Sequence, residues 1–421
     1  MCIFVHMKRI KTVILLFFLL AVHYAQAQDL WGYEYEGEIP IYIDSLHARL
    51  TYPLAHRNYI VSNPTTELQT WKDAARSKVL EYMGVRPPMA ESWDVEVLAE
   101  EQREGYRAQR IAFNLSRWYR AKGYLLIPDG YFSYLDQLKK RQTAQGKKGR
   151  QGKLNLVLPQ YPAIVMMHDH GANLTIGKEK VIRPFAVDTT VVKRADEWVE
   201  MLYAGQYMGD YLAQHGYVVL AIDMPLWGER ARHEGADRGK YDIIAGNMME
   251  AGVNLCAFTH YDDMTSADLL ASLPFIDPMR IGTAGLSIGA YRAWMLAALS
   301  DHIKAAFCDC WMITTEAQLT RKYGRKENGG FANTIPGLRN FLDYPDIASI
   351  AAPNPMLFIA GKKDKLFPLP GVEKAFGIMH DVWTAAGASD QLETYILEQG
   401  HECNLTNQQM MLDFFDKHFK K

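Results

Sequence analysis

The sequence has no excess of charge of either sign, because 46 lysines and arginines are balanced by 48 aspartates and glutamates. A nucleic-acid partner requires a surplus of basic side chains to neutralise its phosphates, so this balance argues against one. Cysteine is scarce, with five residues in 421, and no C-x-x-C spacing is present to suggest a structural zinc site. With 48% apolar and 22% charged residues, the chain has the composition of a globular protein, not a disordered one.

Long apolar runs are also missing, apart from one at residues 12–22. This run is too short to span a bilayer and follows the basic residues Lys8, Arg9 and Lys11, which is typical of a signal-peptide core. Small residues at Ala25 and Ala27 then offer a cleavage site. We therefore expect a signal peptide over residues 1–27 and an exported product, periplasmic or secreted, with no membrane anchor after cleavage.

The rest of the chain divides into an N-terminal arm, residues 28–94, and a larger domain, residues 95–421. The arm contains a helical stretch at 66–83 and is expected to pack on the main body. The larger domain opens with two strands in an antiparallel hairpin and continues with short apolar strands that alternate with helices. The expected strands are 106–115, 118–127, 163–167, 217–222, 280–284, 305–310, 355–360 and 393–397. Such alternation predicts an α/β fold with a mostly parallel sheet and helices on both faces.

Four cysteines remain after the predicted cleavage: Cys256, Cys308, Cys310 and Cys403. Export permits disulfides, but sequence alone does not choose among the three pairings. A spacing of two on a strand places Cys308 and Cys310 on one face, where they pair poorly with each other. The favoured interpretation is a bridge from one of them to Cys403, and the alternative is four buried free thiols.

Seven lysines and arginines and no acidic residue lie between positions 139 and 153. The favoured interpretation is a solvated, mobile hairpin tip, and the alternative is a basic patch that binds an anionic polymer.

The segment Gly285-Leu286-Ser287-Ile288-Gly289 fits G-x-S-x-G at the junction of an expected strand and helix. In such a turn the serine backbone is strained and residues two positions away come close, so glycines relieve the crowding. The turn would present the Ser287 hydroxyl at the carboxyl edge of the sheet, with the Ile288 amide at the start of the helix, ready to bind an oxyanion. The alternative is a small-residue turn that only packs the helix.

A serine becomes nucleophilic when a histidine takes its proton and a carboxylate orients that histidine. Asp364 follows the strand expected at 355–360, in a G-x-x-D-x-x-x-P turn, and His401 follows the last expected strand. The order Ser287, Asp364, His401 is the order found in α/β-hydrolases. The sequence resembles that superfamily from about residue 95 to the C-terminus. Asp309, at the end of an earlier strand, is the alternative acid, because some members use that position.

The second oxyanion donor is expected in the loop after the strand at 163–167. The sequence His168-Asp169-His170-Gly171-Ala172 there is similar to the HG-containing loops of esterases in the superfamily. The resemblance implies that the amide of Ala172 donates, with Gly171 as the alternative. The three side chains before the glycine also look like metal ligands, but neighbours on a strand point to opposite faces, so a packing role is favoured and no metal is expected.

The loop at residues 223–230 resembles the aspartate, aromatic, glycine, arginine pattern of dienelactone hydrolase-like esterases. These include acetyl xylan esterase-like and pectin methylesterase-like carbohydrate esterases. Trp227 and Trp311 are candidate sugar platforms, with a core aromatic role as the alternative for Trp311. Arg230 is a candidate carboxylate ligand, although bracing by neighbouring acids such as Asp223 is the favoured interpretation.

Together these features predict an exported serine esterase with no cofactor, acting on ester decorations of plant polysaccharides. Methyl esters of uronates and O-acetyl groups remain the two candidate substrates, and the basic side chains tilt slightly toward the former. Two alternatives stay open, a serine peptidase of the prolyl-oligopeptidase type and a catalytically inactive sugar-binding relative. A peptidase of that type carries a large upstream propeller, for which residues 28–94 are too few.

Overall fold

The computed structural model describes residues 45, 48–146, 157–171, 173–231, 238–319 and 330–420. The predicted signal peptide lies outside these ranges and stays a prediction, as do the predicted domain boundaries. In the described parts of the chain, no helix has both the length and the apolar character needed to cross a membrane.

A single nine-stranded sheet forms the centre of the molecule, with the strand order β1-β2-β3-β5-β4-β6-β7-β8-β9. Strands β4 to β9 are parallel, while β1, β2 and β3 pair antiparallel and β3 joins the rest by pairing antiparallel with β5. This is the mostly parallel sheet with an antiparallel hairpin that the sequence predicts. The strands are β1 (Glu96–Arg103), β2 (Tyr106–Asn114), β3 (Arg120–Pro128), β4 (Tyr161–Met167), β5 (Val218–Ile222), β6 (Ile276–Leu286), β7 (Ile303–Asp309), β8 (Met356–Gly361) and β9 (Leu392–Leu397).

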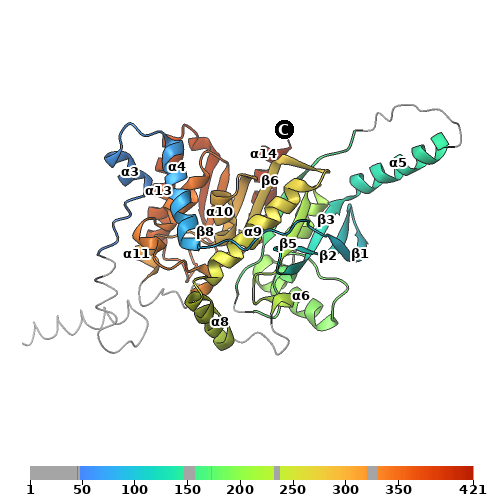
Figure 1. Ribbon diagram of the computed structural model, residues 1–421, viewed down its shortest axis with the longest axis horizontal. Helices are drawn as coiled ribbons and strands as arrows, with labels where there is room; N and C mark the ends of the chain where they lie inside the picture. The colour runs from blue at the N-terminus through green and yellow to red at the C-terminus, as the bar shows by residue number, and fades with distance from the viewer. Residues whose placement is uncertain are drawn as a thin grey trace, which may run out of the picture.

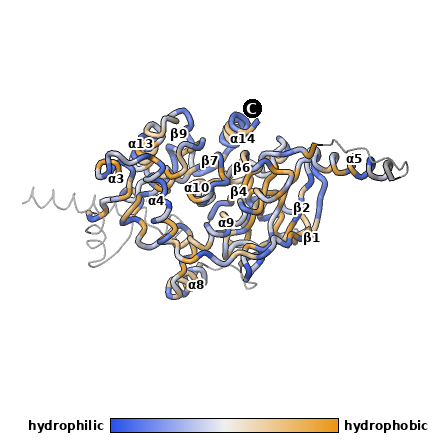
Figure 2. Tube along the Cα trace, turned by 45° about the horizontal axis from the view of Figure 1, so that its top comes forward, coloured by the Kyte–Doolittle hydropathy of each residue, from blue (hydrophilic) through white to orange (hydrophobic). Residues whose placement is uncertain are grey.

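Helices cover both faces of the sheet, as expected for parallel strands that carry near-continuous apolar runs. In Figure 2, α14 lies on one side of the central strands and α9 and α10 lie on the other. The helices are α3 (His56–Ser62), α4 (Leu68–Met83), α5 (Asp129–Gly146), α6 (Thr189–Tyr203), α7 (Met208–Gln214), α8 (Arg238–Glu250), α9 (Leu255–Ser272), α10 (Ile288–Leu299), α11 (Thr315–Gln318), α12 (Tyr344–Ala348), α13 (Leu369–Ala385) and α14 (Leu405–Phe419).

Two apolar cores result, one on each face. On β4, Ala163 and Val165 join the larger core with α4, α9, α10, α12 and α13, whereas Ile164 and Met166 join the smaller core with α6, α7 and α14. The period of two along the strand therefore divides its side chains between the faces. Helix α10 is buried along its whole length, so the residue that precedes it is held on a rigid element.

The described part of the N-terminal arm packs against the larger core. Helix α4 buries Trp71, Ala75, Val79 and Met83, which recur every four residues and so form one stripe. Within the larger core this stripe lies with residues of α9 and α12.

The prediction of a hairpin tip in the basic run is wrong for its described part. Residues 139–146 lie instead in the second half of α5, which projects from the body of the molecule in Figure 1. The reason is local, because Lys, Arg, Gln and Ala make up most of this stretch and are all good helix formers. The sequence analysis also missed β1, whose alternation is masked by the charged side chains of an exposed edge strand.

The turn between β6 and α10 is possible only with glycine on both sides of Ser287. A Cβ on Gly289 would lie 2.4 Å from the carbonyl oxygen of Met167 on β4, and a Cβ on Gly285 would lie 2.4 Å from the carbonyl carbon of Gly289. These neighbours are backbone atoms of strand β4 and of the buried helix α10, and so have little freedom to retreat. The crowding inferred from the motif is therefore present in the structure.

We predict that Gly289→Ala destabilises the fold by about 1–3 kcal/mol or more, because strand β4 or the turn must shift to admit the methyl group. The matched control is Gly377→Ala on α13, where a Cβ meets nothing within 4 Å. That change should be stabilising by about 0.5–1 kcal/mol, as for glycine in a helix interior. Urea denaturation measures both, and equal effects at the two positions would contradict the crowding argument.

Candidate active site

Ser287 occupies a strained backbone conformation at the carboxyl end of β6. Its φ of 58° and ψ of −126° lie outside the regions that non-glycine residues ordinarily adopt, which costs on the order of 1–3 kcal/mol. Its amide donates to the carbonyl of Asp309 at 2.8 Å, and its own carbonyl accepts from the Tyr291 amide at 3.0 Å. The residue is half-buried. Strained residues held by their surroundings in this way cluster at functional sites.

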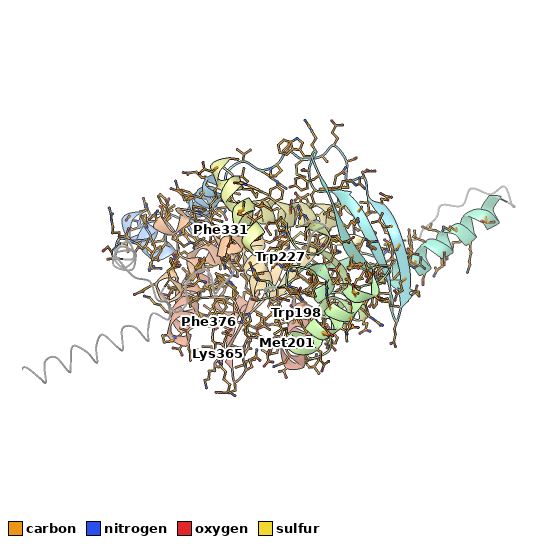
Figure 3. The ribbon with its side chains drawn as sticks, turned by 90° about the horizontal axis from the view of Figure 1, so that it is seen from below. Trp198, Met201, Trp227, Phe331, Lys365 and Phe376 are labelled. Atoms are coloured by element: carbon orange, nitrogen blue, oxygen red, sulfur yellow. The ribbon has the colours of Figure 1, made fainter. Side chains whose placement is uncertain are left out.

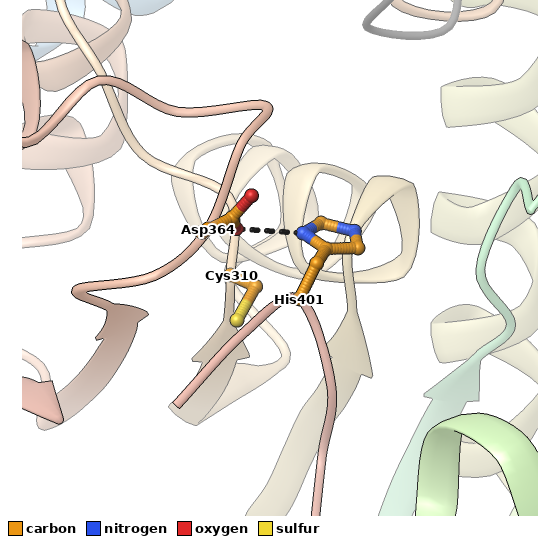
Figure 4. A group of neighbouring side chains, drawn as sticks. All are labelled: Cys310, Asp364 and His401. Carbon is orange, nitrogen blue, oxygen red and sulfur yellow. Dashed lines mark hydrogen bonds and ion pairs between the residues drawn. The ribbon is translucent and has the colours of Figure 1, made fainter. Parts of the chain in front are cut away.

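Asp364 and His401 come from two loops that are fastened to each other beyond β8 and β9. The amide of Lys363 donates to the carbonyl of Gln399 at 2.9 Å, and a Cβ on Gly361 would lie 2.3 Å from the carbonyl oxygen of Gly400. This close approach brings His401 Nδ1 to 2.7 Å from Asp364 Oδ2. Figure 4 shows the imidazole turned so that its second nitrogen points away from the carboxylate.

The aspartate is in turn held in place, because its Oδ1 accepts a hydrogen bond from the Leu366 amide at 2.8 Å. The ring of Phe367 stacks on the imidazole with 5.9 Å between the ring centres. The imidazole therefore has one nitrogen fixed by a carboxylate and one ring face covered by an aromatic.

Burial alone would lower the pKa of His401. The hydrogen bond and charge of Asp364, with smaller contributions from Asp309 and Asp169, outweigh that effect and raise the pKa above its ordinary value of 6.5. The side chain keeps 20% of its surface exposed. An imidazole held in this way can accept and release a proton while its position stays fixed.

The structure does not join all three residues by hydrogen bonds. Within the described residues, neither Ser287 Oγ nor His401 Nε2 makes a hydrogen bond, although both residues lie at the carboxyl edge of the sheet. Catalytic hydrogen bonds are often long or misaligned in a ligand-free enzyme and tighten when substrate binds. The structure supplies an oriented base and a strained serine at the same edge of the sheet.

Asp309, the alternative acid, does not contact the imidazole through a hydrogen bond. It is fully buried at the end of β7 and accepts from Asn407 Nδ2 at 2.8 Å, and burial raises its pKa to about 6. Of the two candidate carboxylates, the one that holds the imidazole is Asp364.

The four cysteines in the described part of the chain are buried free thiols, so the predicted bridge to Cys403 is wrong. The expectation that Cys308 and Cys310 share a face is wrong as well, because Cys308 lies in the larger core and Cys310 in the smaller one. Strand β7 ends at Asp309, and the positive φ of 55° at Cys310 breaks the alternation on which the expectation depended.

The His168-Asp169-His170 sequence packs the loop after β4, as favoured from the sequence. His168 is fully buried, its Nδ1 donates to the carbonyl of Asp169 at 2.9 Å, and its Nε2 accepts from the amide of Met224 at 3.0 Å. Asp169 accepts from Tyr203 Oη at 2.6 Å and from Trp198 Nε1 at 3.1 Å. Both ring nitrogens of His168 are therefore occupied by the backbone and are not free to bind a metal.

The structure describes two of the three candidate oxyanion donors, Ile288 and Gly171. Ile288 is the first residue of α10, so its amide lies at the positive end of a buried helix. Gly171 has a φ of 53°, and a Cβ there would lie 2.0 Å from the Trp198 ring. Ala172 lies outside the described residues, and its role stays a prediction.

A buried lysine, which the sequence analysis missed, connects the loops after β4 and β5. Lys178 Nζ lies 2.7 Å from Glu179, 2.8 Å from Asp223 and 2.9 Å from Glu229. These three carboxylates have the spacing of a metal site, but the ammonium group already sits among them. Their charges outweigh burial and raise the pKa of Lys178 well above its ordinary value. The sequence Gly-Lys-Glu-Lys at residues 177–180 predicts an exposed, solvated lysine. The neighbouring residues therefore give no indication that Lys178 is buried among carboxylates.

Cys310, Asp364 and His401 form the second group with a metal-like spacing. Burial and the neighbouring carboxylates raise the pKa of the Cys310 thiol well above its ordinary value. A thiol binds a metal as the thiolate, so this environment does not favour a metal ion there.

Three candidate substrate-binding residues serve the fold instead. Trp227, which is labelled in Figure 3, is 1% exposed and packs against His170 and Tyr241, so it is not a sugar platform. Trp311 is 2% exposed and packs against Tyr291, Tyr344 and Phe367, which is the core role held open for it.

Arg230 braces its loop, as favoured from the sequence. Its guanidinium lies 2.7 Å from an oxygen of Asp262 and donates to the carbonyl of Asp223 at 3.1 Å. The side chain is 13% exposed, so it has little surface left with which to bind a carboxylate.

Comparison with known proteins identifies relatives of this chain. A model of the abhydrolase family matches residues 187–399. A Bacillus subtilis (strain 168) protein named as a hydrolase, YtaP, is 30% identical over 241 residues, which cover 57% of this chain and 73% of that protein.

Three solved structures have a similar fold. A Bacteroides fragilis protein described as an acetyl xylan esterase has a TM-score of 0.59 and 21% identity over 79% of this chain and 75% of its own. A methylesterase has a TM-score of 0.58 and 15% identity over 90% of this chain and 67% of its own. A glucuronoyl esterase from Solibacter usitatus has a TM-score of 0.55 and 12% identity over 84% and 94%. These likenesses show the α/β-hydrolase fold, which confirms the fold predicted from the sequence.

We predict that the His401 ring titrates with a pKa above 6.5 and that Asp364→Asn lowers this pKa, because the substitution removes the carboxylate charge that favours the imidazolium. NMR titration of the imidazole protons measures both values. Asp413→Asn, on exposed surface of α14, serves as the control and should leave the pKa unchanged. An unchanged pKa in Asp364→Asn would contradict the pairing.

Proposed function

The chain belongs to the abhydrolase family, and from this premise we propose that it is an exported serine esterase that removes ester groups from plant cell-wall polysaccharides. The observation that carries the proposal is the hydrogen bond between His401 and Asp364 at the sheet edge where the strained Ser287 lies. An alcohol held near an oriented base is the arrangement that attacks an ester carbonyl.

In the proposed first step, Ser287 Oγ attacks the carbonyl carbon and His401 Nε2 accepts the hydroxyl proton. Asp364 stabilises the resulting imidazolium through Nδ1–H. The carbonyl oxygen becomes an oxyanion that the amide of Ile288 and a second amide, from Ala172 or Gly171, bind. The imidazolium then gives its proton to the leaving alcohol as the ester bond breaks, which leaves the acyl group on Ser287.

Water completes the cycle by the same route. His401 takes a proton from the water, whose oxygen attacks the acyl carbon, and the acid leaves as Ser287 regains its proton. Because His401 must be neutral to act as a base, activity should rise with pH through its raised pKa. No cofactor takes part in the proposed chemistry.

Methyl esters of uronates are the substrate that the charges favour. Lys362, Lys363 and Lys365 are exposed on the same turn as Asp364, and a partly demethylated uronate polymer carries free carboxylates near each remaining ester. One of the structures with the same fold is a methylesterase. O-acetyl groups are the second candidate, because another such structure is described as an acetyl xylan esterase.

We predict that Ser287→Ala lowers kcat by at least about a thousandfold, since loss of a triad nucleophile removes the covalent route. Initial rates on methyl-esterified polygalacturonate measure this loss. Ser389→Ala, on the exposed surface, is the matched control and should retain full activity. Near-normal turnover by Ser287→Ala would refute the assignment.

The small product released distinguishes the two candidate substrates, because methyl esters give methanol and O-acetyl groups give acetate. The purified protein should release methanol from methyl-esterified polygalacturonate faster than it releases acetate from acetylated xylan. Acetate alone would move the assignment to the second candidate.

A further inference from the structure

A depression of about 580 Å³ lies beside the turn that joins β2 and β3. Two segments line it, residues 90–92 of the N-terminal arm and the turn itself, residues 114–120. The lining combines an exposed indole, two arginines, the carboxylate of Glu91 and small polar groups, which suits a ligand that has both apolar ring faces and hydroxyl or carboxylate groups.

The depression lies at the sheet edge that carries Ser287. Strand β3 runs antiparallel to β5 and pairs Gly123 with Ile222, the last residue of β5, so the residues before Gly123 lie beyond the carboxyl end of β5. On the other side of β5, strand β4 pairs with β6 through Met167 and Gly285, next to the serine turn. Three strand spacings separate β3 from β6, roughly 14 Å in all, which an oligosaccharide of several units can bridge.

A chain of side-chain contacts joins this turn to the loop after β5. Tyr119 Oη donates to Asp262 at 2.8 Å, and Asp262 pairs with Arg230 at 2.7 Å. The turn is also tied to the arm, because the Arg117 amide donates to the carbonyl of Pro88 at 2.9 Å. The depression is therefore fixed relative to the loop after β5 and to the arm.

Trp118 is an exposed indole on a rigid support. It is 72% exposed, whereas the tryptophans first considered as platforms are buried. The turn beneath it is fixed by Ser116 Oγ, which accepts from the amides of Trp118 and Tyr119 at 3.0 and 3.3 Å. The negative face of an indole ring attracts the weakly positive C–H groups of a pyranose, and a rigid support reduces the entropy lost on binding.

Two arginines line the depression against one carboxylate, that of Glu91, so the balance of charge favours an anionic sugar. Arg117 is exposed, and its guanidinium makes no ion pair with any described residue, whereas Arg120 is paired with Asp94. An unpaired guanidinium next to an indole can hold a carboxylate while the sugar ring stacks.

We propose that this depression is a carbohydrate-binding subsite for the main chain of the substrate, in which Trp118 stacks on a pyranose ring and Arg117 binds a uronate carboxylate. The proposal rests on the proposed function for its substrate class. It extends the site from the ester bond to sugar units several positions away, and it predicts a preference for polymers over single sugars.

The test measures binding without turnover, in the Ser287→Ala background. Unesterified oligogalacturonate is titrated by calorimetry, and we expect Trp118→Ala to weaken binding about tenfold, as for loss of a buried aromatic contact. Arg117→Gln should also weaken binding, and Trp118→Phe should retain most of it. Tyr395→Ala is the matched control, since Tyr395 is an exposed aromatic on β9 at the opposite end of the sheet and should leave the affinity unchanged.

Kinetics with active protein give a second readout. In Trp118→Ala, the ratio of kcat/KM for methyl-esterified polygalacturonate to that for methyl galacturonate should fall about tenfold. Unchanged oligosaccharide affinity in Trp118→Ala, or equal affinity for neutral xylo-oligosaccharides, would overturn the subsite. Absence of esterase activity in the unmodified protein would instead refute the proposed function, and the calorimetry would still decide the subsite.

Discussion

The hydrogen bond between His401 Nδ1 and Asp364 is the interaction on which the account of this site depends. It forms because the loops after β8 and β9 approach so closely that only glycine fits at Gly361. The bond fixes which ring nitrogen carries a proton, turns the other nitrogen away from the carboxylate, and raises the pKa of the ring. Without it, the imidazole at this sheet edge would have no fixed orientation from which to activate Ser287.

A buried ionic network supports the opposite side of the site. Lys178 stands among Glu179, Asp223 and Glu229 and so connects the loops that follow β4 and β5. Nearby, Lys180 donates to the carbonyls of Asp169 and His170, which shape the loop expected to bind the oxyanion. Charges removed from water in this way are costly unless paired, so these loops are held in one arrangement. Rigid loops let backbone amides bind an oxyanion without reorganising.

The sequence predicted the parallel part of the fold closely, because buried parallel strands are short apolar runs with clear ends. The strand expected at 355–360 is Met356–Gly361, and that expected at 163–167 is Tyr161–Met167. Ser287, Asp364 and His401 were placed at one edge by the same logic, since carboxyl ends of parallel strands coincide. The sequence did not predict which side chains near this edge are buried and which are exposed. Trp227 follows a strand at this edge, but contacts with residues distant in sequence, such as Tyr241 on α8, bury it. Trp118 is exposed, and the turn that carries it has no recognisable motif.

The central claim is that Ser287 is a nucleophile activated by His401. The most direct measurement is mass spectrometry of the mature protein after reaction with a fluorophosphonate, with the modified peptide sequenced. The account predicts one adduct, on Ser287, that disappears in His401→Ala while that variant remains folded. An adduct on another residue, or equal labelling of Ser287 without the imidazole, would contradict it.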